Sequence, residues 1–331
     1  MPPGDTEKPK PKPKASKKPL KGGLPLPNFL IIGAQRSATR WLRTNLEEHP
    51  EIYTSTVALS FFSNLTRMRR RGLKGYQHQF DAWSGEPLIG ESSPSYLLLG
   101  NRPDQIALRI DAALPDVKLL AIVRQPVDRL HSAVLHHIKR GRLPADANVF
   151  KMIAEGDPDV DTLDLIGGGL YHRSLQPYQD VFGDRLLVLV HDDIRTDPAR
   201  VYADALAHLG AKPGFEPSRL QKVLFSNRRS VKATGAKPTL EQTRALYMLF
   251  RSDVEELEAM TGRYLPEWDP GPPKRNWRSA FPNLDFDTMR RIGAEQDLGE
   301  PEPEPEVDRM RGGTRRRTPS TSGSTSRRPA R

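Results

Sequence analysis

The sequence predicts an α/β fold with a central, mainly parallel sheet covered by helices on both faces. Short apolar runs alternate with longer amphipathic stretches across residues 25–268, and Pro and Gly separate them. Continuously apolar strands are typical of parallel sheets that are buried on both faces. The predicted strands, in chain order, are Phe29–Ala34, Leu88–Glu91, Lys118–Val123 and Arg185–Val190.

Helices are predicted between and after these strands. The first covers residues 37–49, because Pro50 cannot continue a helix. The second covers residues 126–141 and begins with Pro126, a residue favoured in a first helical turn. A third, long helix is predicted over 239–262, with a capping box at its start and a glycine at its end.

The two ends of the chain differ in composition from this region. Residues 1–24 alternate Lys and Pro and offer little apolar surface, so we expect a disordered tail. Residues 271–331 carry an acidic Pro-Glu run and then many arginines, and we expect them to be mostly disordered. The folded domain is therefore expected at 25–270. Basic tails can contact an anionic polymer or membrane surface, but a solubilising role is favoured because no aromatic residues are interleaved.

Several classes of site are disfavoured by what the sequence lacks. It contains no Cys, which excludes disulfides, thiolate metal sites and a Cys nucleophile. No His, Asp and Glu cluster has metal-ligand spacing, so no metal is expected. No apolar run approaches the length of a membrane span and no secretory signal stands at the start, so the expected location is cytoplasmic.

The clearest local motif follows the first predicted strand. The stretch GAQRSATR, residues 33–40, lies between that strand and a helix, where main-chain N–H groups converge and bind phosphate. A Walker A loop that began at Gly33 would have its second Gly at the position of Ala38 and its Lys at the position of Thr39. The motif therefore disfavours a P-loop nucleotide kinase, which stays an alternative, and a purely structural turn is the other interpretation.

Three segments together resemble PAPS-dependent sulfotransferases of the bacterial and heparan-sulfate-type branch (PAPS, 3′-phosphoadenosine 5′-phosphosulfate). IIGAQRSATRWLRTNLEEHPEI resembles the family's 5′-phosphosulfate loop, and LLAIVRQPVDRLHSAVLHH resembles its 3′-phosphate segment. GESSPSY resembles a Gly-Glu-x-[Ser/Thr]-Pro-x-Tyr segment of the same family. GGGLYHRSLQPYQDVFGDRLLVLVHDDI and RSDVEELEAMTGRYLPEW also resemble sulfotransferase segments, so the resemblance spans nearly all of residues 28–268. It implies a P-loop-like three-layer fold with PAPS as donor and no metal.

The resemblance also implies donor-binding residues. In the first loop, Arg36 stands where many members have Lys, and Ala38 replaces a common Gly. Arg124 and Ser132 correspond to the 3′-phosphate pair, and Arg228 could close over the donor from a late loop. The full set implied for donor binding is Gln35, Arg36, Ser37, Ala38, Thr39, Arg40, Arg124, Ser132 and Arg228.

Three residues are candidates for the chemistry. Arg36 can neutralise the charge that grows on the leaving phosphate. Glu91 corresponds to the proposed base of the glycan enzymes, provided that burial raises its pKa, and His136 is the next candidate. The alternative for Glu91 is a structural salt bridge, with Arg36 or Arg40 as the partner.

The implied activity is transfer of a sulfuryl group to a hydroxyl or amine of a glycan, glycolipid or other small-molecule acceptor. Ser92 replaces the Lys of the heparan sulfate enzymes, so their acceptor specificity does not carry over. Besides the kinase, a third hypothesis is an inactive PAPS-fold module that binds anionic polymers through the basic tails.

Overall fold

The computed structural model of this protein describes residues 25–221 and 237–285. The tail predicted for 1–24 and most of the tail predicted after 270 lie outside the described residues. No described helix combines the length and apolar character needed to cross a bilayer.

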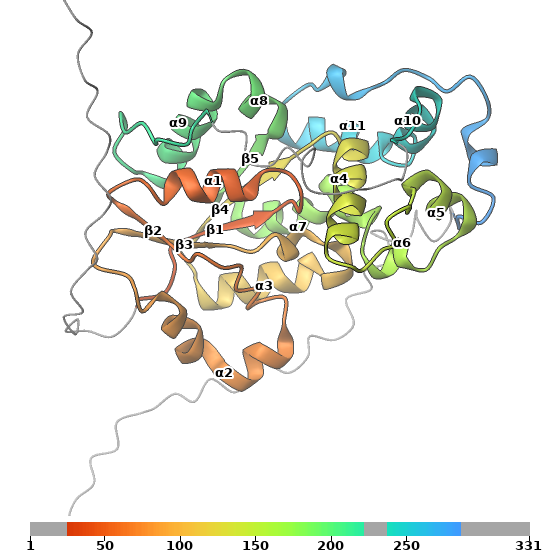
Figure 1. Ribbon diagram of the computed structural model, residues 1–331. Helices are drawn as coiled ribbons and strands as arrows, with labels where there is room; N and C mark the ends of the chain where they lie inside the picture. Colours follow the sequence, from red (N-terminus) through yellow and green to blue (C-terminus); the bar gives the residue numbers. More distant parts are fainter. Residues whose placement is uncertain (1–24, 222–236, 286–331) are drawn as a thin grey trace, which may run out of the picture. The chain divides into compact units, whose positions relative to one another are not determined.

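The described residues form a five-stranded parallel sheet in the order β2-β3-β1-β4-β5 (Figure 1). The predicted α/β class with a parallel sheet is confirmed. β2 was not predicted, because a strand of three residues shows no periodicity of its own. The strands are β1 (Phe29–Gly33), β2 (Ile52–Thr54), β3 (Leu88–Ser92), β4 (Lys118–Val123) and β5 (Leu186–Val190).

Helices cover both faces of the sheet, with α1 and α9 on one side and α3 and α7 on the other (Figure 1). The described helices are α1 (Thr39–Leu46), α2 (Leu65–Gln77), α3 (Pro103–Ala113), α4 (Pro126–Lys139), α5 (Val149–Glu155), α6 (Asp159–Thr162), α7 (Tyr171–Phe182), α8 (His191–Thr196), α9 (Pro198–Leu209), α10 (Leu240–Tyr247) and α11 (Arg251–Thr261).

The central strand β1 is buried on both faces. Phe29 and Ile31 join an apolar cluster with Trp41 of α1 and Leu206 of α9. Because side chains alternate along a strand, Leu30 points to the opposite face. This two-sided burial is the reason that the strand sequence is continuously apolar.

The helix predicted over 239–262 is divided into α10 and α11. The predicted capping box at Thr239 is present, and Gly262 ends α11 in a left-handed conformation. Between them, Leu249 and Phe250 form main-chain hydrogen bonds to residues three positions earlier. Leu246, Tyr247, Leu249 and Phe250 are all buried. One face of a straight helix cannot bury side chains at so many neighbouring positions, so the helix is divided here.

Ordered structure continues beyond residue 270, where the sequence placed the domain end. Phe281 is fully buried and packs against Phe150 of α5, with ring centroids 5.3 Å apart. Nδ2 of Asn283 donates a hydrogen bond of 3.1 Å to the carbonyl of Ala154. The packed region therefore reaches residue 285, because a single aromatic side chain in a polar segment anchors it.

The strand order reverses at β1, which makes the carboxyl end of β1 a topological switch point. From β1 the chain first builds β2 and β3 on one side, and then returns to build β4 on the other side. Ligands of open α/β sheets bind outside the carboxyl ends of the strands at such a reversal. The segments that follow β1, β3 and β4 all meet at this edge.

Candidate active site

The loop between β1 and α1 has a tightly curved main chain. Arg36 and Ala38 have φ values of 71° and 70°, in the left-handed region that few non-glycine residues occupy. Ala38, as the N-cap of α1, offers no side-chain acceptor, and the first turn contains no acidic residue. Such a concave turn before a helix N-terminus is typical of anion sites.

Gly33 begins this loop because the main chain passes close to Leu97. A Cβ atom on Gly33 would lie 2.8 Å from the Leu97 side chain, closer than real contacts allow. Its φ of 157° also belongs to the range that disfavours other residues.

Arg36 joins the two segments predicted to bind the ends of the donor. Its Nε donates a hydrogen bond of 3.1 Å to Oγ of Ser132 in α4. Nη1 of Arg124, directly after β4, donates to the carbonyl of Arg36 at 3.3 Å. Three predicted site residues from distant parts of the sequence therefore meet at the carboxyl edge of the sheet.

Positive charge accumulates around this contact. Burial lowers the pKa of Arg36, and the nearby charges of Arg124 and Arg129 lower it further. Arg129 is completely buried in α4, and its Nη2 donates to the carbonyl of Leu165. Like charges held together favour the entry of an anion. Arg129 was not among the predicted site residues, although it is the second Arg of the Arg-x-Pro-x-x-Arg pattern.

The other predicted loop residues differ in burial. Ser37 is fully buried, and Thr39 is almost buried at the first residue of α1. Oε1 of Gln35 is buried and accepts no hydrogen bond from the described residues. Arg40 is exposed. Arg228 lies outside the described residues.

Glu91 is enclosed rather than presented to the loop. It is completely buried at the end of β3. Its Oε1 accepts hydrogen bonds from the hydroxyls of Tyr76 at 2.8 Å and Tyr96 at 2.7 Å. Its Oε2 accepts from Oγ of Ser93 at 2.8 Å and from the N–H of Leu59 at 3.2 Å. Burial raises its pKa, and the four hydrogen bonds oppose that effect.

These contacts occupy both carboxylate oxygens of Glu91. A general base must reach the proton that it removes. This carboxylate connects Tyr76 of α2 to the segment at Leu59 and to the 93–96 turn. The salt bridge considered with Arg36 or Arg40 is also replaced, because hydroxyl and main-chain donors surround both oxygens.

His136 lies on the helix that carries Ser132. It follows Ser132 by one turn of α4, so the two side chains share a helix face. Burial and then the charge of Arg36 lower the pKa of His136 to about 4. The half-buried imidazole is therefore neutral near pH 7 and has a lone pair that can accept a proton.

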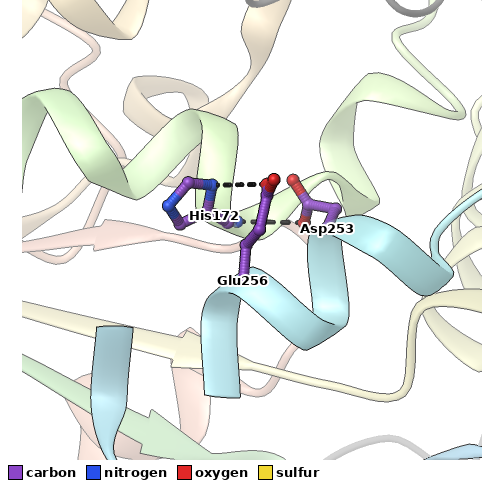
Figure 2. A group of neighbouring side chains, drawn as sticks. All are labelled: His172, Asp253 and Glu256. Atoms are coloured by element: carbon purple, nitrogen blue, oxygen red, sulfur yellow. Dashed lines mark hydrogen bonds and ion pairs between the residues drawn. The ribbon is translucent and has the colours of Figure 1, made fainter. Parts of the chain in front are cut away.

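A second polar cluster joins α7 and α11 (Figure 2). His172, Asp253 and Glu256 form the one group in the described residues with the arrangement of a possible metal site. Asp253, however, accepts hydrogen bonds from the main-chain N–H groups of His172 at 3.0 Å and Arg173 at 3.1 Å. It thus caps the N-terminus of α7, and Nδ1 of His172 lies 2.9 Å from Glu256. Sequence analysis could not reveal this contact, because the cap comes from a different helix.

Comparisons with known proteins agree with this architecture. No family model matches the chain. It is 27% identical over 163 residues to the membrane-associated sulfotransferase kil1 of Dictyostelium discoideum, covering 47% of this chain and 33% of that protein. It is 26% identical over 264 residues to mouse heparan sulfate glucosamine 3-O-sulfotransferase 3B1, covering 73% of this chain and 65% of that protein. The chain thus spans between one and two thirds of these curated relatives.

A solved structure extends the likeness to the fold. The sulfotransferase from Alicyclobacillus acidocaldarius is 28% identical, with a TM-score of 0.61, and the match covers 74% of this chain and 99% of that one. The parallel sheet and the basic loop after its central strand define a P-loop-like α/β fold. In sequence and fold, the chain is similar to sulfotransferases.

Proposed function

We propose that the protein transfers a sulfuryl group from PAPS to a hydroxyl or amine of a carbohydrate or other small-molecule acceptor, by in-line displacement. The observation that carries this proposal is the 3.1 Å hydrogen bond between Arg36 and Ser132. It joins the loop suited to a 5′-phosphosulfate to the helix suited to a 3′-phosphate, within one site.

The residues around this contact fit such a donor. The pKa of Arg36 is lowered by burial and by its positive neighbours, and a polyanion would offset the repulsion. Arg36 and the first turn of α1 would hold the 5′-phosphosulfate, while Arg124 and Ser132 would hold the 3′-phosphate. Bound PAPS supplies the sulfuryl group and the leaving phosphate. Arg36 stabilises the negative charge that grows on the leaving oxygen.

We assign proton removal to His136 in place of the carboxylate expected from the sequence. A ring nitrogen of His136 accepts the proton of the acceptor hydroxyl as the oxygen attacks. A pKa of about 4 would make a weak base, but an anion beside Arg36 would offset the charge that lowers it. Glu91 contributes by holding the walls of the site in place.

The acceptor class is suggested by α2. Arg69, Arg70, Arg71 and Lys74 are exposed there, and the helix contains no acidic residue. Tyr76 of the same helix contacts Glu91, which joins α2 to the catalytic edge of the sheet. An anionic glycan would complement this surface, in keeping with relatives named for heparan sulfate.

The test is transfer of label from ³⁵S-PAPS to a panel of anionic glycans, neutral glycans, glycolipids and hydroxylated small molecules. Arg124→Ala should raise the KM for PAPS, whereas Arg36→Ala should lower kcat as well, because its contact strengthens as the bond breaks. Phosphate transfer from ATP and Mg²⁺ would favour the kinase. Polymer binding that survives Arg36→Ala and needs the basic tails would favour the inactive module.

A further inference from the structure

We propose that Tyr171 is a positioning residue that fixes the turn bearing Arg124 and thereby sets the preference for a 3′-phosphate. The proposal rests on the donor site proposed above and concerns how that site recognises one end of the donor.

Tyr171 contacts the main chain of the turn that bears Arg124. It is completely buried at the first residue of α7, on the face of the sheet opposite α1. Its hydroxyl accepts a hydrogen bond of 3.4 Å from the main-chain N–H of Arg124. That N–H is the first after β4, where the strand ladder has ended, so the hydroxyl continues the support of the main chain.

The start of α7, and so Tyr171, is itself held in place. Leu170 at the N-cap has no side-chain acceptor. Asp253 of α11 instead accepts from the N–H groups of His172 (Figure 2) and Arg173. The preceding turn packs against Arg129, since a Cβ on Gly168 would lie 2.5 Å from its Nη1. A larger residue at that glycine would displace the arginine side chain.

A second tether acts on the neighbouring residue. Nε2 of Gln125 donates to the carbonyl of Trp268 at 3.1 Å. Nε1 of the fully buried Trp268 donates to Oδ2 of Asp192, after β5, at 2.9 Å. Trp268 also lies beside Tyr171, with ring centroids 6.3 Å apart. The turn is therefore fixed by side chains that lie far from it in sequence.

This support matters most for the 3′-phosphate. Arg124 uses one end of its guanidinium on the carbonyl of Arg36 and the other lies 3.9 Å from Asp128. A small rotation of the main chain would move both contacts. Loss of the Tyr171 hydroxyl should therefore weaken recognition of the phosphate that Arg124 would bind.

The experiment compares two nucleotides on the full chain. Calorimetry measures Kd for adenosine 3′,5′-bisphosphate and for adenosine 5′-phosphate, which lacks the 3′-phosphate, and the ratio of the two reports recognition of that group. Tyr171→Phe removes one hydroxyl and should reduce the ratio about five-fold, the effect of one neutral hydrogen bond, mainly through weaker bisphosphate binding.

Tyr178→Phe is the matched control. Tyr178 is equally buried on the same helix, and its hydroxyl donates to the carbonyl of Tyr96 at 2.9 Å, away from Arg124. It should lower the thermal midpoint of unfolding and leave the ratio unchanged. An unchanged ratio in Tyr171→Phe, or an equal fall in both variants, would overturn the proposal. A wild-type protein without preference for the bisphosphate would instead refute the donor site itself.

Discussion

Burial separates the roles of Glu91 and His136, the two residues considered as the base. Glu91 is fully enclosed by four donors, whereas His136 is half-buried beside Arg36. The sequence identifies both residues as candidates. It does not show that side chains from α2 and the 93–96 turn shield Glu91 from solvent. Because of this shielding, we propose the imidazole of His136, and not the carboxylate of Glu91, as the base.

His136→Asn should lower turnover with PAPS by roughly 100-fold or more, the usual effect of losing a general base. Affinity for adenosine 3′,5′-bisphosphate should stay nearly unchanged, because the residue takes no part in donor anchoring. Steady-state kinetics and calorimetry measure the two effects. Wild-type turnover in this variant would contradict the assignment.

Glu91→Gln should act on stability instead. An amide cannot accept all four hydrogen bonds, so the free energy of unfolding should fall by about 1–3 kcal/mol. Urea denaturation measures the loss, and active-site titration gives turnover per folded molecule, which we expect to be largely kept. A collapse of turnover in fully folded protein would restore Glu91 as the base.

Asp253 should make stability depend on pH. Burial raises its pKa to about 6, although hydrogen bonds from Arg173 and His172 oppose the effect. This pKa exceeds the pKa of Asp in the unfolded chain. The protonated Asp253 side chain therefore stabilises the fold at low pH, and this stabilisation is lost as pH rises through about 6. The free energy of unfolding of the wild type, measured by urea denaturation relative to Asp253→Asn, should fall by on the order of 2–3 kcal/mol between pH 4 and 7.5. The control is Asp180→Asn, at an exposed residue of α7, which should keep the pH dependence of the wild type.

At the scale of elements, four of the strands follow from continuous apolar runs, and α1 and α4 follow from their Pro signals. β2 and the break between α10 and α11 do not follow from the local sequence. β2 depends on its pairing with β3, and the break depends on the burial of Phe250. Local sequence thus predicts the elements that it stabilises by itself. Those that depend on a distant partner become evident only in the folded chain.

The basic helix α2 should contribute to binding of the acceptor. Replacing Arg70 and Arg71 together by Ala should raise KM for an anionic glycan and weaken its dependence on salt, because fewer charges are neutralised on binding. A neutral acceptor provides the control and should be unaffected. Equal losses for both acceptors would indicate that the substitutions disturb α2 rather than its charge.

For the whole molecule, the C-terminal limit of the fold can be tested directly. A chain of residues 25–270 lacks Phe281, whose removal exposes an apolar site on α5. It should be less stable than residues 25–285 by about 3 kcal/mol, comparable with loss of a buried Phe. Phe281→Ala in the full chain should reproduce most of this loss in thermal unfolding. Equal stability of the two shortened chains would place the limit at 270 after all.

The contact of Trp268 with Gln125 also affects when the site can form during synthesis. The turn bearing Arg124 gains this support only after a segment more than 140 residues later has left the ribosome. Contacts so distant in sequence form late in folding. A nascent chain that already displays the loop after β1 would therefore remain unable to grip a nucleotide at both ends until nearly the whole domain has emerged.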